Sequence, residues 1–222
     1  MTSKVPEVAQ PRGRRDFWND FYANSATFWE ISLPSQFAAF VANEIDRQAH
    51  VIDIGCGNAR DSFFFSRHGF KVTGLDASEA AIASAKEHTQ VQGGDDLEFF
   101  RTNLADGQVQ QVLSERRADT VCVYARFFLH AITDEEEDLL IAALHEACRP
   151  GDIAAFEFRT LADRDLVKVA APHFRRYMCP SQLDAKMERH LFSKSYGVEG
   201  IGYAKYKSED AIVARAIYER KP

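Results

Sequence analysis

Short apolar segments alternate with helix-forming segments along most of this 222-residue chain. The apolar segments have the length of β-strands and cover residues 51–54, 71–76, 97–102, 120–124 and 153–158. The segments predicted to be helical cover residues 35–47, 59–68, 78–89, 105–116 and 133–149. This alternation predicts an α/β fold, a mostly parallel, doubly wound sheet with helices on both faces. Because ligands of such sheets bind at the carboxyl ends of the strands, the residues after each strand are the candidate site.

Length and composition indicate a single domain. A chain of this size with 45% hydrophobic residues supports one sizeable core and is short for two. We expect a flexible polar leader over residues 1–15 and one domain over residues 16–222. Within the domain, the aromatic-rich segment 16–48 is a candidate cap or lid, and two less regular strands are predicted at 198–206 and 211–219.

Charge and cysteine content restrict the partners. The formal net charge of -6 repels polyanions and disfavours binding to nucleic acid. No apolar run approaches the roughly 20 residues that span a bilayer, and the apolar core of a secretory signal is absent. We therefore expect a cytoplasmic monomer or homodimer without a membrane partner. No metal site or disulfide framework is predicted, because no CxxC pair occurs among Cys56, Cys122, Cys148 and Cys179.

A glycine pair and an aspartate follow the first two predicted strands. Gly55 and Gly57 let the backbone turn tightly and approach a ligand, and Asp76 ends the next strand, 21 positions after Gly55. A carboxylate at that place accepts hydrogen bonds from both hydroxyls of a ribose, so the pattern predicts a nucleoside ligand. An NAD-dependent oxidoreductase is disfavoured, because its GxGxxG fingerprint requires glycine where this chain has Arg60.

Five sequence motifs cover the predicted strands and the loops that follow them. They are VIDIGCGNARD (51–61), VTGLDAS (72–78), LEFFRTNLAD (97–106), DTVCVYARFFLHAI (119–132) and LHEACRPGDIAAFEFR (144–159). Together they resemble the class I S-adenosylmethionine-dependent methyltransferase family, and the first two are the most specific. The resemblance implies a Rossmann-like, mostly parallel seven-stranded sheet with an antiparallel C-terminal strand. It also implies S-adenosyl-L-methionine as cofactor, with S-adenosyl-L-homocysteine as product.

Position within the first two motifs assigns part of the donor site. By the resemblance, Gly55 and Gly57 line the methionine and ribose portion of the donor, and Asp76 binds the ribose hydroxyls. Ala77 lies against the adenine. This chain departs from the family pattern at Ala59, where GxGxG would continue with glycine.

The other motif residues complete the implied donor site. Asn103 and Leu104 occupy the place of the adenine-amine contact. Many members have aspartate in place of Asn103, but the amide oxygen also accepts a hydrogen bond. Tyr124 borders the methionine group and the transferred methyl, and Asp53 and Asp61 of the first motif are counted among the donor-binding residues.

The segment GNARDSFFFSRHG (57–69) is also similar, more weakly, to the thiopurine and tellurite methyltransferase branch. This similarity implies a small acceptor molecule that is reached under an N-terminal lid. It places Trp18, Tyr22 and Trp29 over the donor. The alternative explanation for these aromatic side chains is simple packing of an N-terminal helix.

His130 follows the fourth predicted strand, where members of the family gather acceptor contacts. Methyl transfer is an in-line displacement, so the protein aligns the reactants, excludes water and, for a hydroxyl acceptor, removes a proton. A histidine that titrates near neutrality suits the last task, and His130 is predicted to be the catalytic base. A histidine bonded to backbone is the alternative.

A basic cluster follows the fourth and fifth predicted strands. Arg126 and Arg159 come directly after them, and the segment 160–195, a candidate acceptor-side insertion, supplies His173, Arg175, Arg176 and Tyr177. In an acidic protein this cluster predicts binding of a carboxylate or phosphate on the acceptor. The alternative is that the arginines are solvated or paired with nearby acids such as Asp163, Asp165 and Glu157.

These patterns favour a methyltransferase that acts on a small molecule, with oxygen, nitrogen and sulfur acceptors all open. A nucleic-acid methyltransferase is an alternative, but the acidic charge and the lack of an Asn-Pro-Pro-Tyr type tetrapeptide after the fourth strand count against it. A non-catalytic donor-binding partner or regulator is a further alternative, because binding and turnover use different residues.

Overall fold

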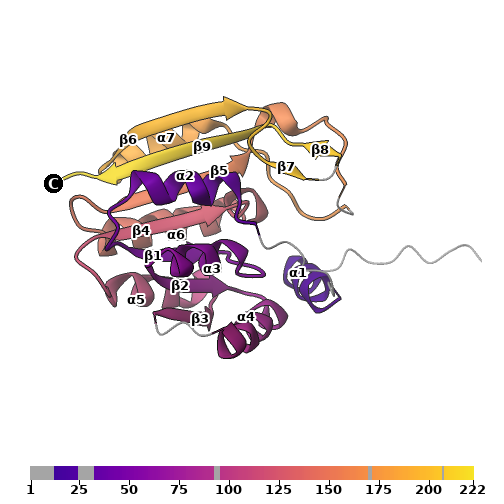
Figure 1. Cartoon of the computed structure of the whole chain (residues 1–222). Coiled ribbons are helices and arrows are strands. Elements are labelled where there is room, and N and C mark those ends of the chain that lie inside the picture. Colours follow the sequence, from indigo (N-terminus) through magenta and orange to yellow (C-terminus); the bar gives the residue numbers. More distant parts are fainter. Residues whose placement is uncertain (1–12, 25–32, 93–95, 170–171, 207) are drawn as a thin grey trace, which may run out of the picture.

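The computed structural model describes residues 13–24, 33–92, 96–169, 172–206 and 208–222. Its main sheet has seven strands in the order β3-β2-β1-β4-β5-β9-β6 (Figure 1). The strands β1 to β5 run parallel to one another, and β9 runs antiparallel to both β5 and β6. The sequence prediction of a mostly parallel, seven-stranded sheet with an antiparallel C-terminal strand is confirmed.

The elements follow the predicted alternation. The strands are β1 (His50–Ile54), β2 (Lys71–Asp76), β3 (Leu97–Arg101), β4 (Val121–Arg126), β5 (Ile153–Arg159), β6 (Phe192–Gly200) and β9 (Val213–Arg220), with a small hairpin of β7 (Lys205–Tyr206) and β8 (Glu209–Asp210). The helices are α1 (Arg14–Ala23), α2 (Gln36–Glu44), α3 (Arg60–Arg67), α4 (Glu79–Gln92), α5 (Gln108–Ser114), α6 (Asp134–Ala147) and α7 (Pro180–Arg189). Short 3-10 turns occur at η2 (Leu104–Asp106), η3 (Leu129–Ala131) and η4 (Leu161–Asp163).

Two hydrophobic layers hold helices on opposite faces of the sheet. On one face α5, α6 and α7 contribute the buried side chains Val109, Leu140 and Met187. On the other face α2, α3 and α4 contribute Phe37, Phe65 and Ile82. Successive strand residues point to opposite faces of the sheet, and helices cover both faces. The buried strands are therefore nearly continuous apolar runs in the sequence. No helix in the described ranges is long and apolar enough to cross a membrane.

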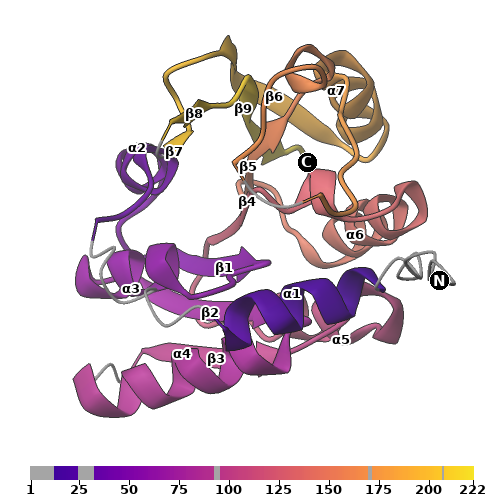
Figure 2. The ribbon, with the colours of Figure 1, turned by 90° about the vertical axis from the view of Figure 1, so that its right-hand side faces the viewer.

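The N-terminal helix α1 lies beside the carboxyl ends of the strands, in front of β1 and β2 (Figure 2). It begins at Arg14, so the last two residues of the predicted leader belong to this helix. None of its residues is fully buried. Trp29, one of the predicted lid residues, and residues 1–12 of the predicted leader lie outside the described residues.

Other boundaries also differ from the prediction. The strand predicted at 198–206 instead starts at Phe192, as the edge strand β6, where exposed polar residues hide the apolar pattern. The helix α7 was not predicted at all. The helix predicted at 105–116 is divided by Gly107, whose φ of 68° is left-handed, into the turn η2 and the helix α5.

His50 makes the stability of this fold depend on pH. Its buried Nε2 lies 2.8 Å from Thr73 Oγ1, and burial together with Arg117, Lys71 and Arg116 lowers its pKa to about 4. The unfolded chain binds this proton near the ordinary pKa of 6.5, so stability is lost as the pH falls from about 6.5 towards 4.

We expect urea unfolding to show a loss of about 3 kcal/mol from this group over that pH range. His50→Leu should flatten the pH dependence of the free energy of unfolding. Equal slopes in wild type and His50→Leu would contradict the assignment.

Candidate active site

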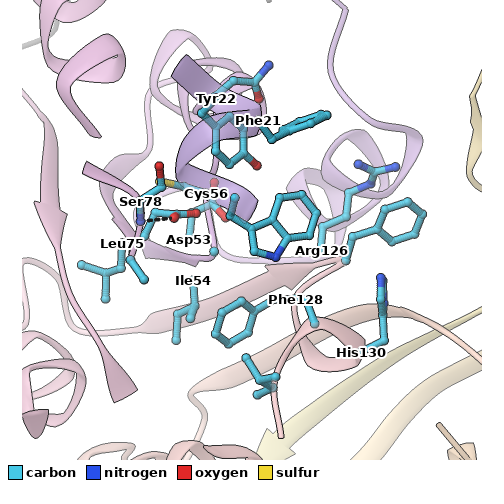
Figure 3. A pocket seen from close by; sticks show the side chains of 18 of the residues that line it. Phe21, Tyr22, Asp53, Ile54, Cys56, Leu75, Ser78, Arg126, Phe128 and His130 are labelled. Atoms are coloured by element: carbon cyan, nitrogen blue, oxygen red, sulfur yellow. Dashed lines mark hydrogen bonds between the residues drawn. The ribbon is translucent and has the colours of Figure 1, made fainter. Parts of the chain in front are cut away.

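A cavity of about 590 Å³ opens where the strands β1, β2 and β4 end. The helix α1, the turn η3, the segment around His173 and the β7–β8 hairpin complete its walls. In the close view of Figure 3, Asp53, Cys56 and Ser78 lie towards one end, and Arg126 and His130 lie towards the other. We call these the donor end and the acceptor end, after the predictions for their residues.

The loop after β1 requires glycine at two positions. Gly55 and Gly57 have φ values of 74° and 54°, in the left-handed region. A Cβ on Gly55 would lie 2.4 Å from Phe128 Cδ2, and a Cβ on Gly57 would lie 2.2 Å from the Tyr22 hydroxyl. Ala59 also has a left-handed φ, 59°, which keeps the loop tight without the third glycine of the family pattern.

The carboxylate of Asp76 is held at the end of β2 by backbone N–H groups. Gly57 N donates to Asp76 Oδ2 at 2.9 Å, and Ser78 N donates to Asp76 Oδ1 at 2.8 Å. Each oxygen keeps a second lone pair, so both can still accept a ligand hydroxyl. Burial raises the pKa of Asp76 in spite of these hydrogen bonds.

Asp53 is a buried acid at the same end of the cavity. Its Oδ2 accepts a hydrogen bond of 2.5 Å from Ser62 Oγ. Burial, and then the charges of Asp61 and Asp76, outweigh that hydrogen bond and raise the pKa of Asp53 to about 7. A cation bound beside it would lower this pKa, because opposite charge favours the ionised carboxylate.

Asp61 and Tyr124 line the cavity, but their polar atoms are bound within the protein. Asp61 accepts hydrogen bonds from Ser35 N at 2.8 Å, Ser35 Oγ at 2.7 Å and the Tyr124 hydroxyl at 2.8 Å. Burial favours the neutral acid, but Arg60, Arg126 and Ser35 hold the pKa of Asp61 below its usual value. This carboxylate therefore ties the start of α2 to α3 and β4.

The three residues predicted at the adenine also line the cavity, which brings them beside Asp76. They are Ala77, Asn103 and Leu104. Asn103 Oδ1 accepts a hydrogen bond of 3.3 Å from Ala105 N, at the start of η2, and keeps one lone pair for a ligand.

The helix α1 covers the cavity and contacts both ends. At the donor end, Asn19 Oδ1 accepts hydrogen bonds from Ser78 Oγ at 3.3 Å and Ala80 N at 3.1 Å. At the acceptor end, Trp18 packs edge-on against His173 with ring centroids 5.1 Å apart. Trp18 and Tyr22, two of the three predicted lid residues, both line the cavity from the helix α1. The lid prediction and the alternative of simple helix packing therefore concern the same side chains.

Arg126 ends β4 at the acceptor end. Its Nε lies 2.8 Å from Oε1 of the fully buried Glu157, whose Oε2 accepts a hydrogen bond of 2.7 Å from Arg215 Nε. Its guanidinium lies 4.4 Å from the ring centroid of Phe127, which has an unusual φ of 56°. Within the described residues, the terminal nitrogens of Arg126 make no hydrogen bond.

His130 lies on η3 and is buried at the acceptor end. Its Nδ1 accepts a hydrogen bond of 3.2 Å from the backbone N–H of Arg159, so the ring proton is on Nε2. Burial, then Arg159, Arg175, His173 and Arg126, lower its pKa well below the ordinary value. With the Nδ1 lone pair occupied and a proton on Nε2, the ring has no free basic nitrogen, which does not support the predicted role of a base.

The predicted acceptor residues fall into two groups. Arg175 and His173 line the cavity, and Arg175 Nη2 lies 3.2 Å from His173 Nε2. Arg159 also lines it, but its guanidinium is paired with Asp163 at 2.6 Å and with Glu209. The remaining two residues do not line it: Arg176 pairs with Asp134 and Glu137, and Tyr177 lies against Lys168.

Sequence reasoning missed several cavity residues. Phe128 packs over Gly55, and Ser78 supports Asp76, although both stand inside the quoted motifs. Lys205 and Tyr206 reach the acceptor end from the β7–β8 hairpin, which carries no motif. Only the antiparallel strand pairing of the last strands brings that hairpin to the cavity.

Comparisons with known proteins match these features. Residues 51–151 match the family model described as a methyltransferase domain. The chain is similar to the ubiquinone biosynthesis O-methyltransferase of Caulobacter vibrioides, with 31% identity over 138 residues, 61% of this chain and 52% of that protein. The match therefore spans about half the length of this curated relative.

Two solved structures share the fold. A SAM-dependent methyltransferase from Anabaena variabilis superposes with a TM-score of 0.71 and 17% identity over 99% of this chain and 100% of that one. A TehB-like SAM-dependent methyltransferase from Corynebacterium glutamicum has a TM-score of 0.66 and 17% identity, over 91% and 99% of the two chains. The fold is that of the class I methyltransferases, and the predicted resemblance to this family is confirmed over residues 51–151.

Because Arg159 is paired with two buried acids, we predict that its side chain stabilises the fold. Arg175 has no such pair within the described residues, and we predict that its side chain contributes little to stability. Arg159→Met leaves the buried Asp163 and Glu209 with one cation fewer, so urea unfolding should show a loss of about 3 kcal/mol. Arg175→Met, the matched control, removes only a contact with His173 and should cost less than about 1 kcal/mol. Equal losses would contradict this division.

Proposed function

We propose that this protein is an S-adenosylmethionine-dependent methyltransferase that acts on a small molecule bearing a carboxylate or phosphate. The observation that carries the proposal is one continuous cavity, which joins the glycine loop and Asp76 to Arg126 and Arg175. Its volume of about 590 Å³ is in the range of small-molecule sites. The match of residues 51–151 to a methyltransferase domain supports the same reaction.

The residues at the donor end fit S-adenosylmethionine. Gly55 and Gly57 place no side chain of their own between the backbone and a ligand, and Asp76 offers two lone pairs for ribose hydroxyls. Ala77 and Asn103 would border the adenine. When bound, the cofactor supplies an electrophilic methyl group on a positively charged sulfur.

The residues at the acceptor end fit an anion. Arg175 makes no ion pair within the described ranges, and the terminal nitrogens of Arg126 are not used by described protein groups. Both side chains line the cavity beside His130, whose Nε2 is a further donor. Arginine binds carboxylates and phosphates through its planar set of N–H groups, so this end would hold and orient an anionic acceptor.

The proposed donor site is tested by calorimetric titration with S-adenosylmethionine, S-adenosylhomocysteine and NAD. We expect the first two to bind and NAD not to bind. Asp76→Ala should weaken binding by roughly 10- to 100-fold, the effect of losing hydrogen bonds to a charged group. Glu79→Gln removes a surface carboxylate three positions away and is the control, with unchanged affinity. Binding of NAD alone would refute the proposal.

The titration of Asp53 predicts pH-dependent donor binding. The positive sulfur of S-adenosylmethionine favours ionised Asp53, so binding near pH 7 releases a proton and should tighten as the pH rises through about 7. We expect a change of up to about tenfold per pH unit on the acid side. S-adenosylhomocysteine lacks that charge and should vary less, and Asp53→Asn should remove the difference between the two ligands. A difference that persists in Asp53→Asn would exclude Asp53 as its source.

A further inference from the structure

We propose, on the basis of the function proposed above, that the acceptor atom is already an anion near neutral pH. Such an atom is a thiolate sulfur or a carboxylate oxygen, and no side chain needs to take a proton from it. The proposal rests on the histidines and carboxylates described at the acceptor end: each of them is already engaged by another protein group, while the terminal nitrogens of Arg126 and the guanidinium of Arg175 remain available to an anion.

Both histidines at the acceptor end have their basic nitrogen occupied. The lone pair of His130 Nδ1 accepts the Arg159 N–H, so Nε2 carries a proton and cannot take another. In His173, Nε2 lies 3.2 Å from Arg175 Nη2 and must accept, because arginine only donates. The His173 ring is also stacked on Phe17, with centroids 4.5 Å apart.

The carboxylates at this end are also engaged. Glu157 lies between Arg126 and Arg215, and its two oxygens face one arginine each. Glu209 pairs with Arg159 and accepts a hydrogen bond of 2.7 Å from Val169 N, and its pKa is held below the usual value despite burial. A carboxylate that is stabilised in its ionised form is a weak base.

Glu136 lies at the rim of the cavity and is engaged in the same way. It pairs with Arg14 of α1, and its Oε2 accepts a hydrogen bond of 2.8 Å from Thr133 N in the capping box of α6. Asp53 and Asp76 belong to the donor end. Asp61 is further saturated by three hydrogen bonds from Ser35 and Tyr124, described above.

The carboxylates described at the acceptor end do not compensate all of the positive charge around the acceptor. The pKa of His130 is lowered by four basic neighbours, namely Arg159, Arg175, His173 and Arg126, in addition to its burial. Arg159 is neutralised by its acids, but Arg175 has no carboxylate partner in the described structure. The side chains therefore favour an anion over a neutral hydroxyl or a protonated amine.

The chemical step then balances without a proton. A lone pair on the anionic sulfur or oxygen forms the bond to the methyl carbon, the bond from that carbon to the donor sulfur breaks, and its electron pair stays on that sulfur. One negative and one positive charge disappear, and the products are a neutral thioether or ester and a neutral donor sulfide. The arginines and His130 hold the acceptor in line and exclude water.

The test uses three acceptors with one carboxylated skeleton and different nucleophiles. The full-length protein is incubated with S-adenosylmethionine and 4-mercaptobenzoate, 4-hydroxybenzoate or 4-aminobenzoate, and mass spectrometry with NMR identifies the methylated atom. At about pH 7 the aromatic thiol ionises much more readily than the phenol, and the amine has no anionic form. We expect the thioether or the methyl ester as product, at a rate that does not rise with pH once the nucleophile is ionised.

Methylation of the amine, or of the phenol at a rate that does not follow its ionisation, would overturn the inference while the proposed function stands. Donor binding without transfer to the thiolate or the carboxylate would overturn it as well, because an aromatic thiolate is a strong nucleophile. A protein that fails to bind S-adenosylmethionine would instead refute the proposed function, so the two failures are distinguishable.

His130 variants give a second readout. Gln carries an N–H donor at a position similar to Nε2 but has no basic nitrogen, so His130→Gln should retain thiolate methylation within about tenfold and with an unchanged pH profile. His130→Ala should mainly raise KM. If His130 were a base, both variants would lose about 100-fold or more in kcat, and the pH profile would change.

Discussion

A buried carboxylate shared by two arginines fixes the acceptor end of this molecule. Glu157 is fully buried on β5, and the sheet register places Arg126 of β4 and Arg215 of β9 on either side of it. Burying such charges is costly unless they are paired, so this arrangement requires that all three strands be in register. It depends on the antiparallel strand β9, which lies between β5 and the edge strand β6. The guanidinium of Arg126 is thereby held at the cavity wall.

The donor end was largely predictable from the sequence because its residues lie in short motifs. Gly57 and Asp76 are 19 positions apart and meet through one hydrogen bond, since β1 and β2 are adjacent parallel strands. The alternation of strands and helices along the chain predicts that adjacency. The roles of Asp61 and Tyr124 were less accessible, because their partner Ser35 lies in a segment without a motif.

The acceptor end was predicted only in part, for a physical reason. A sequence shows which residues can carry charge but not which acids neutralise them. Arg159 pairs with Glu209, which comes from the β7–β8 hairpin 50 positions away, and Arg176 pairs with Glu137 on α6. Arg175 has the same residue type and a neighbouring position, but it remains available because its side chain meets His173 rather than an acid.

The two ends of the cavity carry opposite charge, and this difference bears on the chemistry. Burial and the charges of Asp61 and Asp76 raise the pKa of Asp53, whereas burial and the charges of Arg159, Arg175, His173 and Arg126 lower the pKa of His130. An acidic end suits a cationic donor, and a basic end suits an anionic acceptor. Transfer of a methyl group from such a donor to an anionic acceptor atom would remove the positive charge of the donor sulfur and the negative charge of that atom, which would weaken the attraction of each end for its product. The electrostatics that favour binding of the reactants would then also favour release of the products.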